Sequence, residues 1–327
     1  MSRSMCTVDE AARRIESGES LLIAGEEALL SQLPEGRWIG GTIPYFVTSE
    51  GGQMTRELLR VEALPSEVTE VSIRSYSADD LDRISRDAFV DGFSVIIVPG
   101  GSVVHTSFAV EAVELRDHFA NPLVGWVAGV HLDELGTRRP RTYAGSGEKG
   151  STAAAVVMHA RLAPGKRATA ATATMFSPGD GATLTFEYTG FYQDDVLVDG
   201  EPRGFAEYLA EVGHDARLPL VADLGGENVN VSIQSVPEDG ETVNLYAPVF
   251  SGVEYRLAAP VEDLAAAYDA QIPGLTVPPV FAFTCVLNYT YSHLEGRKAG
   301  DVVGPATFGE IAYQLHNQTL VYLTIDG

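Results

Sequence analysis

Cysteine is scarce in this sequence, with only Cys6 and Cys285 among 327 residues. Two cysteines far apart in the chain do not provide the disulfide framework that holds many secreted proteins together. The sequence also lacks an apolar run of the ~20 residues that span a bilayer, and its first ten residues contain no signal-peptide core. We therefore expect a soluble protein of the reducing cytoplasm.

Basic residues are few as well. The chain contains 22 Lys and Arg against 45 Asp and Glu, which gives a formal net charge of -23. Such a surface repels the phosphates of nucleic acids and of anionic lipids. We expect neither nucleic acid nor a membrane as partner, which leaves a small molecule and a downstream signalling protein.

Signals for metal binding and for common hydrolases are missing too. The seven histidines are scattered without the short spacings of zinc ligands, and there is no cysteine pair. No Gly-x-Ser-x-Gly sequence occurs. We expect no metal and no cofactor, with haem as the one alternative, for which His105 after a glycine turn is the candidate axial ligand.

The patterns that are present indicate a mixed α+β fold. A capping box at Thr7 and Glu10 predicts a helix that runs to about residue 15. Residues 93–98 form an apolar run typical of a buried strand, and a helix over 106–119 and a strand over 123–130 follow. Alternating strands and helices predict mixed β-sheets flanked by helices, arranged in two related halves.

Changes in composition suggest where those halves divide. Residues 137–150 are polar and contain three arginines and several glycines, so they are the best candidate for a linker. We therefore expect one half over residues 1–150, connecting strands over 151–189, and a second half over 190–327.

Three segments share a pattern of paired apolar residues followed by glycine and small residues, at 38–42, 123–129 and 302–310. One interpretation is that these are three unrelated strand ends, where glycine is common. The other is that related strands end in glycine turns around a shared cleft, where glycine lets a ligand approach the backbone.

Four segments in order carry a family resemblance. They are Val-Asp-Gly-Glu-Pro at 198–202 with Tyr208, Phe-Ala-Phe-Thr-Cys at 281–285, Gly-Pro-Ala-Thr-Phe-Gly-Glu-Ile at 304–311, and His-Asn-Gln-Thr at 316–319. Together they resemble the C-terminal domain of the FIST family. Residues 95–98 and 123–129 are similar, more loosely, to strand and glycine-turn pairs of FIST N-terminal domains.

The resemblance implies a sensory fold that binds a small molecule, in a divergent member without a kinase, cyclase or chemotaxis module on this chain. Such a protein acts alone or passes its signal to another protein. The sequence departs from the family near Cys285, where Asn288 stands in the neighbourhood of a common arginine.

We expect a small polar, amino-acid-like metabolite to bind reversibly in the cleft between the halves. The candidate ligand-binding residues are Gly125, Trp126, Cys285, Asn288, Phe308, Glu310, His316 and Asn317. Trp126 offers a wall for apolar or cation–π contact. The side chains of Asn288, Glu310 and Asn317 offer orienting hydrogen bonds.

Each of these residues also has a structural interpretation. Glu310 can cap a helix N-terminus, His316 can be satisfied by backbone groups, and Cys285 can be a small buried hydrophobe. Two alternatives to sensing stay open. One is a thiol-dependent hydrolase or transferase that uses Cys285 and His316, and the other is a scaffold without a ligand.

Overall fold

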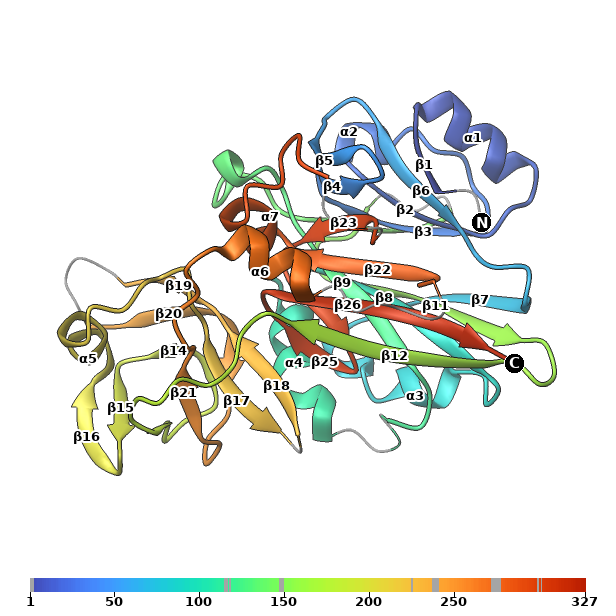
Figure 1. Cartoon of the computed structure of the whole chain (residues 1–327). Helices are drawn as coiled ribbons and strands as arrows, with labels where there is room; N and C mark the ends of the chain where they lie inside the picture. Colours follow the sequence, from blue (N-terminus) through green and yellow to red (C-terminus); the bar gives the residue numbers. More distant parts are fainter. Residues whose placement is uncertain are drawn as a thin grey trace.

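The structure is a computed structural model that describes residues 3–114, 117, 119–146, 150–224, 226–236, 241–271, 278–298, 300 and 302–327. Five β-sheets make up most of it, and three of them pack side by side with few helices between them (Figure 1). The other two sheets form a second body beside these three. None of the helices in the described part of the chain has the length and apolarity needed to cross a bilayer.

The first sheet consists, in order, of β1 (Arg3–Cys6), β6 (Leu59–Ala63), β2 (Leu21–Gly25), β3 (Trp38–Thr42) and β10 (Thr142–Ala144). Helix α1 (Val8–Glu16) packs against it, with Ala11 and Ile15 buried. The predicted capping box is present at Thr7 and Glu10. The short helix α2 (Glu27–Leu30) connects β2 to β3.

The second sheet consists of β25 (Gln314–His316), β24 (Glu310–Ala312), β9 (Leu123–Ala128), β8 (Gly92–Pro99), β11 (Ala155–Leu162) and β7 (Val68–Tyr76). Helices α3 (Arg83–Asp87) and α4 (Val103–Glu111) accompany it. Successive residues of β8 enter two different cores, with Val95 and Ile97 on one face and Ile96 and Val98 on the other. Burial on both faces explains why the predicted strand at 93–98 is continuously apolar.

The third sheet consists of β12 (Arg167–Thr174), β26 (Thr319–Asp326), β22 (Phe281–Cys285), β23 (Gly304–Thr307), β4 (Tyr45–Thr48) and β5 (Gly51–Met54). Helices α6 (Leu264–Gln271) and α7 (Val286–Tyr291) lie at the end of β22 (Figure 1). Strand β23 pairs with β4, although residues 49–303 separate them in the sequence. This sheet therefore joins the two ends of the chain.

The second body contains a six-stranded sheet of β16 (Glu201–Gly204), β15 (Asp195–Val198), β13 (Leu184–Thr185), β21 (Tyr255–Leu257), β17 (Leu220–Leu224) and β18 (Glu227–Val231). Its small sheet consists of β14 (Gly190–Gln193), β20 (Val243–Val249) and β19 (Ile233–Ser235). Helix α5 (Phe205–Glu211) buries Phe205 and Leu209 in the same core as α4.

The three glycine-containing segments belong to three similar units. In each unit a strand, a helix and a parallel strand follow one another, as β2-α2-β3, β8-α4-β9 and β22-α7-β23. The ends of the second strands of these units, β3, β9 and β23, are joined by hydrogen bonds. The Gly129 N–H, just after β9, donates to the Thr42 carbonyl at the end of β3 (2.7 Å). The Val127 N–H of β9 donates to the Gly309 carbonyl, just after β23 (2.8 Å). The described residues thus contain three such units, where the sequence suggested two related halves.

The mixed α+β class is confirmed, and several boundaries differ from the expected ones. Helix α4 ends at Glu111 instead of about residue 119, and residues 115, 116 and 118 lie outside the described residues. Strand pairing also crosses the expected boundaries near residues 150 and 190. Strand β11 follows residue 150 and pairs with β8 before it, and β24 follows residue 190 and pairs with β9.

The expected linker at 137–150 is tied to the first sheet. It contains β10, which pairs with β3. Two of its arginines form ion pairs with Glu27, Arg141 at 2.8 Å and Arg138 at 3.3 Å. Residues 147–149 lie outside the described residues. Backbone pairing and ion pairs together make this segment part of a sheet and not a connection between domains.

A buried polar chain crosses the second sheet at His159, which is completely buried on β11. The Tyr76 hydroxyl donates to Asp87 (3.0 Å), so its oxygen accepts from His159 Nε2 (2.8 Å). His159 Nδ1 then accepts from the Ser94 hydroxyl (2.8 Å). Burial lowers the pKa of His159 to about 4. Its neutral imidazole is therefore the form that the fold accommodates.

We predict that His159 makes the fold sensitive to acid. The unfolded chain binds a proton near pH 6.5 and the folded chain only near pH 4, so stability is present above pH 6.5 and is lost as the pH falls towards 4. Between pH 7 and pH 5 the free energy of unfolding should fall by about 2 kcal/mol through this residue. Urea unfolding of the wild type and of His159→Gln at both pH values measures the difference.

The control is His293→Asn, because His293 is exposed and asparagine tolerates its positive φ of 50°. It should lose as much stability as the wild type between the two pH values. Equal losses in His159→Gln and the wild type would contradict the prediction.

Candidate functional site

Two of the predicted residues, Cys285 and Glu310, lie together between the second and third sheets. Cys285 ends β22 and is the N-cap of α7, while Glu310 begins β24. The Cys285 thiol and the Glu310 carboxyl group lie close enough for each to influence the pKa of the other. Both residues are buried, with 1% and 0% of their surfaces exposed.

Hydrogen bonds fix the Glu310 carboxyl group on both oxygens. Oε1 accepts from the Thr307 hydroxyl (3.1 Å) and Oε2 accepts from the Thr319 N–H (3.3 Å). These bonds favour the carboxylate, yet burial outweighs them and raises the pKa of Glu310 well above its ordinary value. The site thus contains a hydrogen-bonded carboxyl group that retains its proton to a higher pH than an ordinary glutamic acid.

The pKa of the Cys285 thiol is also raised well above its ordinary value, first by burial and then by the Glu310 carboxyl group. The backbone N–H groups of Leu287, Asn288 and Gln318 act in the opposite direction, because they face the sulfur. Each of these effects is smaller than that of burial. A neutral thiol is therefore the form that this environment favours.

Asn288 occupies the third position of α7 and has no exposed surface. Neither its side-chain oxygen nor its side-chain nitrogen has a hydrogen-bond partner among the described residues. A side chain at this position reaches back towards the N-cap, as in a capping box, and the N-cap is Cys285. An unpaired buried amide costs about 1–3 kcal/mol per unsatisfied group, so this side chain requires an explanation.

Asn317 has a structural role instead. Its Nδ2 donates to the His316 carbonyl (3.2 Å) and its Oδ1 accepts from the Ser232 N–H (3.4 Å). Nearby, Asn230 Nδ2 donates to the carbonyls of Asn317 (3.2 Å) and Gln318 (3.3 Å). These bonds hold the turn between β25 and β26 against the sheet of the second body.

The structure does not bring His316 to Cys285. His316 Nε2 is hydrogen-bonded to the Ala312 carbonyl (3.3 Å), and within the described residues Nδ1 has no partner. Burial lowers the pKa of His316 to about 4. The acidic group that contacts the thiol is Glu310, so a Cys285–His316 pair is absent from the described part of the chain.

The remaining predicted residues surround this site or pack the sheets. Trp126 is the cross-strand partner of Glu310 and packs against Phe283 with the rings tilted at 32° and their centroids 5.1 Å apart. A Cβ added to Gly125 would lie 1.8 Å from the Ile96 carbonyl oxygen, so close strand contact explains this glycine. The Phe308 ring similarly fills the space beside Gly129. The glycine turns converge, but these neighbours occupy the space between them.

Two tyrosines lie within electrostatic range of Cys285. Tyr246 on β20 and Tyr291 at the end of α7 are half-buried. Burial is the main cause of the raised pKa of each phenol, and the Cys285 thiol contributes to both shifts. The enclosed site is therefore within electrostatic range of side chains that reach the surface.

Sequence reasoning missed Asn230, Thr307, Gln318 and both tyrosines. Thr307 and Gln318 belong to the segments on which the family resemblance rests, so their proximity to Glu310 could have drawn attention to them. Asn230, Tyr246 and Tyr291 come from separate parts of the chain, and no local pattern distinguishes them.

The described residues contain no group of three or more His, Cys, Asp or Glu side chains arranged to hold a metal ion. His105, the alternative haem ligand, lies on α4 and packs against Phe191, with ring centroids 5.6 Å apart. Its Nδ1 accepts from the Gly101 N–H (3.3 Å). That nitrogen is thus engaged by the glycine turn before the helix.

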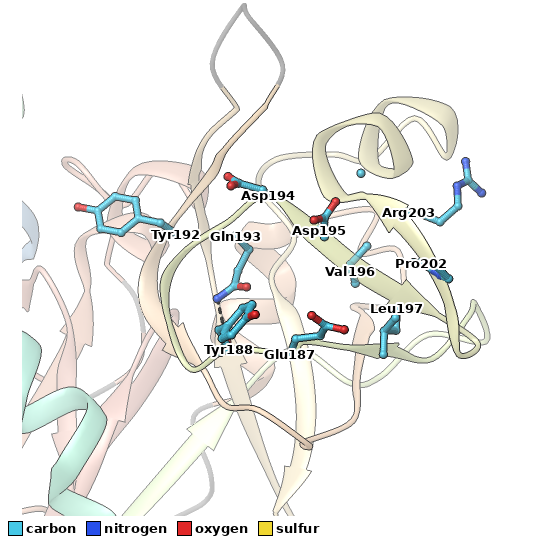
Figure 2. Close-up of a pocket in the computed structure, with 11 residues that line it drawn as sticks. Glu187, Tyr188, Tyr192, Gln193, Asp194, Asp195, Val196, Leu197, Pro202 and Arg203 are labelled. Carbon is cyan, nitrogen blue, oxygen red and sulfur yellow. Dashed lines mark hydrogen bonds between the residues drawn. The ribbon is translucent and has the colours of Figure 1, made fainter.

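A separate pocket of about 350 Å³ opens in the second body, where strands β14 to β16 meet (Figure 2). Glu187, Asp194 and Asp195 line it, and the Arg203 side chain extends away from them (Figure 2) towards its ion-pair partner Glu211. None of the predicted site residues contributes to its walls.

We predict that Glu310 destabilises the fold increasingly as the pH rises. Above pH 4.5 the unfolded chain loses this proton while the folded chain keeps it, so the free energy of unfolding falls with pH up to the raised pKa of Glu310. Glu310→Gln removes the titration and keeps an acceptor. Its stability relative to the wild type should rise between pH 5 and pH 8, by at most about 1.4 kcal/mol per pH unit.

Urea unfolding at several pH values measures this difference, with Glu201→Gln at the exposed first residue of β16 as the control. A difference between Glu310→Gln and the wild type that stays constant with pH would show that the carboxyl group ionises normally.

Comparison with known proteins places the chain in a family. No curated protein matches it. Residues 6–326, which contain the Cys285–Glu310 pair and all five sheets' central strands, match a family of unknown function (DUF6976). Because the match covers nearly the whole chain, the protein belongs to this family.

Proposed function

We propose that the protein binds a small polar molecule reversibly at a site formed by Cys285, Asn288 and Glu310, here called the Asn288 site, and that it acts as a sensor. The unpaired amide of Asn288 carries this proposal. Its nitrogen and oxygen are both buried without partners among the described residues. A ligand with one donor and one acceptor would satisfy both atoms and recover the cost of leaving them unpaired.

The neighbouring groups support binding of an uncharged or weakly charged polar group. The thiol of Cys285 favours its neutral form and the carboxyl group of Glu310 retains its proton above the usual range. A protonated carboxyl group donates one hydrogen bond and accepts others. Trp126 is beside Glu310 in the sheet, but its indole nitrogen, which has no partner among the described residues, lies next to Gly41 of β3. An amide, carboxyl or amino-acid-like group matches this set of donors and acceptors.

The resemblance of residues 304–323 to FIST C-terminal domains supports a sensory role. Glu310 and the turn at Asn317 and Gln318 come from this segment, and both contribute to the Asn288 site or its immediate support. On this proposal the ligand state would pass to a separate output protein. Cys6 and Cys285 are buried and form no disulfide bond in the described structure, which is in keeping with a reducing cytoplasm.

A thiol-dependent enzyme is the second candidate, and the contact between Cys285 and Glu310 is the observation that favours it. Two observations weigh against it. A nucleophilic cysteine needs a lowered thiol pKa, whereas the pKa of this thiol is raised. The expected base, His316, is hydrogen-bonded to a backbone carbonyl. These facts favour binding over catalysis.

We predict that Cys285 reacts slowly with alkylating reagents in the folded protein. In a Cys6→Ser background, iodoacetamide at neutral pH should modify Cys285 at least about tenfold more slowly than in the urea-unfolded chain, because each unit of raised pKa lowers the thiolate fraction tenfold. Mass spectrometry follows the reaction. Alkylation at the rate of the unfolded chain would favour the thiol enzyme.

We also predict that Asn288→Leu stabilises the unliganded protein. Leucine has nearly the same shape and leaves no unpaired polar atoms, so the free energy of unfolding should rise by about 1 kcal/mol or more. The same variant should lose any stabilisation by ligand. A thermal-shift screen with amino acids, nucleotides and haem tests this, since a ligand at about 100 times its Kd stabilises by about 2.7 kcal/mol.

Asn230→Leu is the matched control, because Asn230 is equally buried but its amide nitrogen is hydrogen-bonded. It should lose stability. If Asn288→Leu is destabilised to the same extent, the amide of Asn288 is satisfied in solution without a ligand. If no compound in the screen stabilises the wild type, a scaffold role is favoured.

A further inference from the structure

A second cavity, of about 530 Å³, opens between the two bodies of the molecule, and we call it the hairpin cleft. Its floor includes residues 170–172 of β12 and the hairpin of β24 and β25 from Ala312 to His316. The opposite wall includes Phe250, Ser251 and Val253. Of the predicted site residues only His316 lines it, so it is distinct from the Asn288 site.

The charged residues of the hairpin cleft are all acidic. Glu114 and Glu227 line it, and no lysine or arginine is among its described lining residues. Glu227 contributes to the raised pKa of the Tyr313 phenol, after burial, which places its carboxylate within range of that ring. The whole chain has a formal net charge of -23. The local and overall charges both favour a cation and repel an anion.

His316 adds a specific requirement. Its Nε2 must be the donor in the bond to Ala312, because a carbonyl oxygen only accepts. Nδ1 is then an acceptor, and it has no partner among the described residues. His316 is 2% exposed at the floor of the cleft. An N–H or O–H donor is needed to satisfy it.

The other walls are largely apolar. Phe250, Val253 and Leu224 contribute carbon surface on one side, and the Tyr313 ring on the other. Aromatic faces attract cations and also pack against hydrocarbon. Thr172 and Ser251 supply hydroxyl groups that can accept from a donor. The cleft therefore combines acidic groups and acceptors with apolar walls.

From this combination we infer that the hairpin cleft binds a protonated primary or secondary amine with an apolar body. The ammonium group lies beside Glu227 and His316, where a turn of the imidazole ring would let the buried Nδ1 atom accept a hydrogen bond from it. The hydrocarbon body lies against Phe250, Val253 and Tyr313. This inference does not depend on the Asn288 site.

Isothermal titration calorimetry with four phenyl compounds of similar size tests the inference. Phenethylamine has the charge and the N–H donors, phenethyltrimethylammonium has the charge alone, 2-phenylethanol has a donor without charge, and 3-phenylpropionate has the opposite charge. Phenethylamine should bind most tightly, with affinity that falls as salt is added. The trimethylammonium compound should bind about tenfold more weakly because it cannot donate a hydrogen bond, and the alcohol about tenfold more weakly because its hydrogen bond is not assisted by charge.

Variants locate the binding. Glu227→Gln should weaken phenethylamine about tenfold and reduce its salt dependence, and Ser251→Trp should abolish binding by filling the cleft. Asn288→Leu and the exposed Glu201→Gln should bind it as the wild type does, which separates this inference from the proposed function. Both cleft variants alter residues that are half-buried or exposed, so far-UV circular dichroism should confirm that they fold.

Three results would overturn the inference. One is the absence of phenethylamine binding at millimolar concentrations. Another is an equal or tighter affinity for 3-phenylpropionate. The third is an unchanged affinity in folded Glu227→Gln and Ser251→Trp, which would place the amine elsewhere on the acidic surface.

Discussion

The carboxyl group of Glu310 forms hydrogen bonds at the place where the chain passes from the third sheet to the second. Residues before it form β23 in the third sheet, and residues after it form β24 in the second. Its oxygens accept from Thr307 on one side of this crossing and from Thr319 on the other. The thiol of Cys285 completes its surroundings. The relative position of the two sheets, and every group of the Asn288 site, depend on these bonds.

Some buried polar side chains in the described structure have hydrogen-bond partners and others have none. Asn230, Asn317 and Gln318 join the two bodies through bonds that leave few of their atoms unpaired. Asn288 is equally buried and has none in the described structure. Stable folds pair nearly all buried polar atoms, and functional sites are where exceptions concentrate. Asn230 and Asn317 therefore belong to a structural hydrogen-bond network, whereas we interpret Asn288 as part of a binding site.

Patterns of neighbouring residues predicted much of the fold. Contacts between residues far apart in the sequence could not be predicted. The strand at residues 93–98 and the capping box at Thr7 were correct because adjacent residues determine them. Apolar residues continue past Cys285, yet β22 ends there, since Val286 and Leu287 are apolar in either conformation and only packing selects α7. Glu310 was predicted as a site residue, but its contact with Cys285 requires the pairing of β24 with β9, which no local pattern contains.

The pairing of β23 with β4 has a consequence for synthesis of the protein on the ribosome. Strands β4 and β5 are made early, yet their neighbour in the third sheet is among the last segments to emerge. Until then the apolar residues of β4, such as Phe46 and Val47, have no sheet to cover them. Long-range pairing of this kind slows folding and exposes strand edges that aggregate. A nascent chain lacking its last forty residues should therefore be a chaperone substrate, and truncation at the C-terminus should be far more damaging than truncation of an ordinary terminal strand.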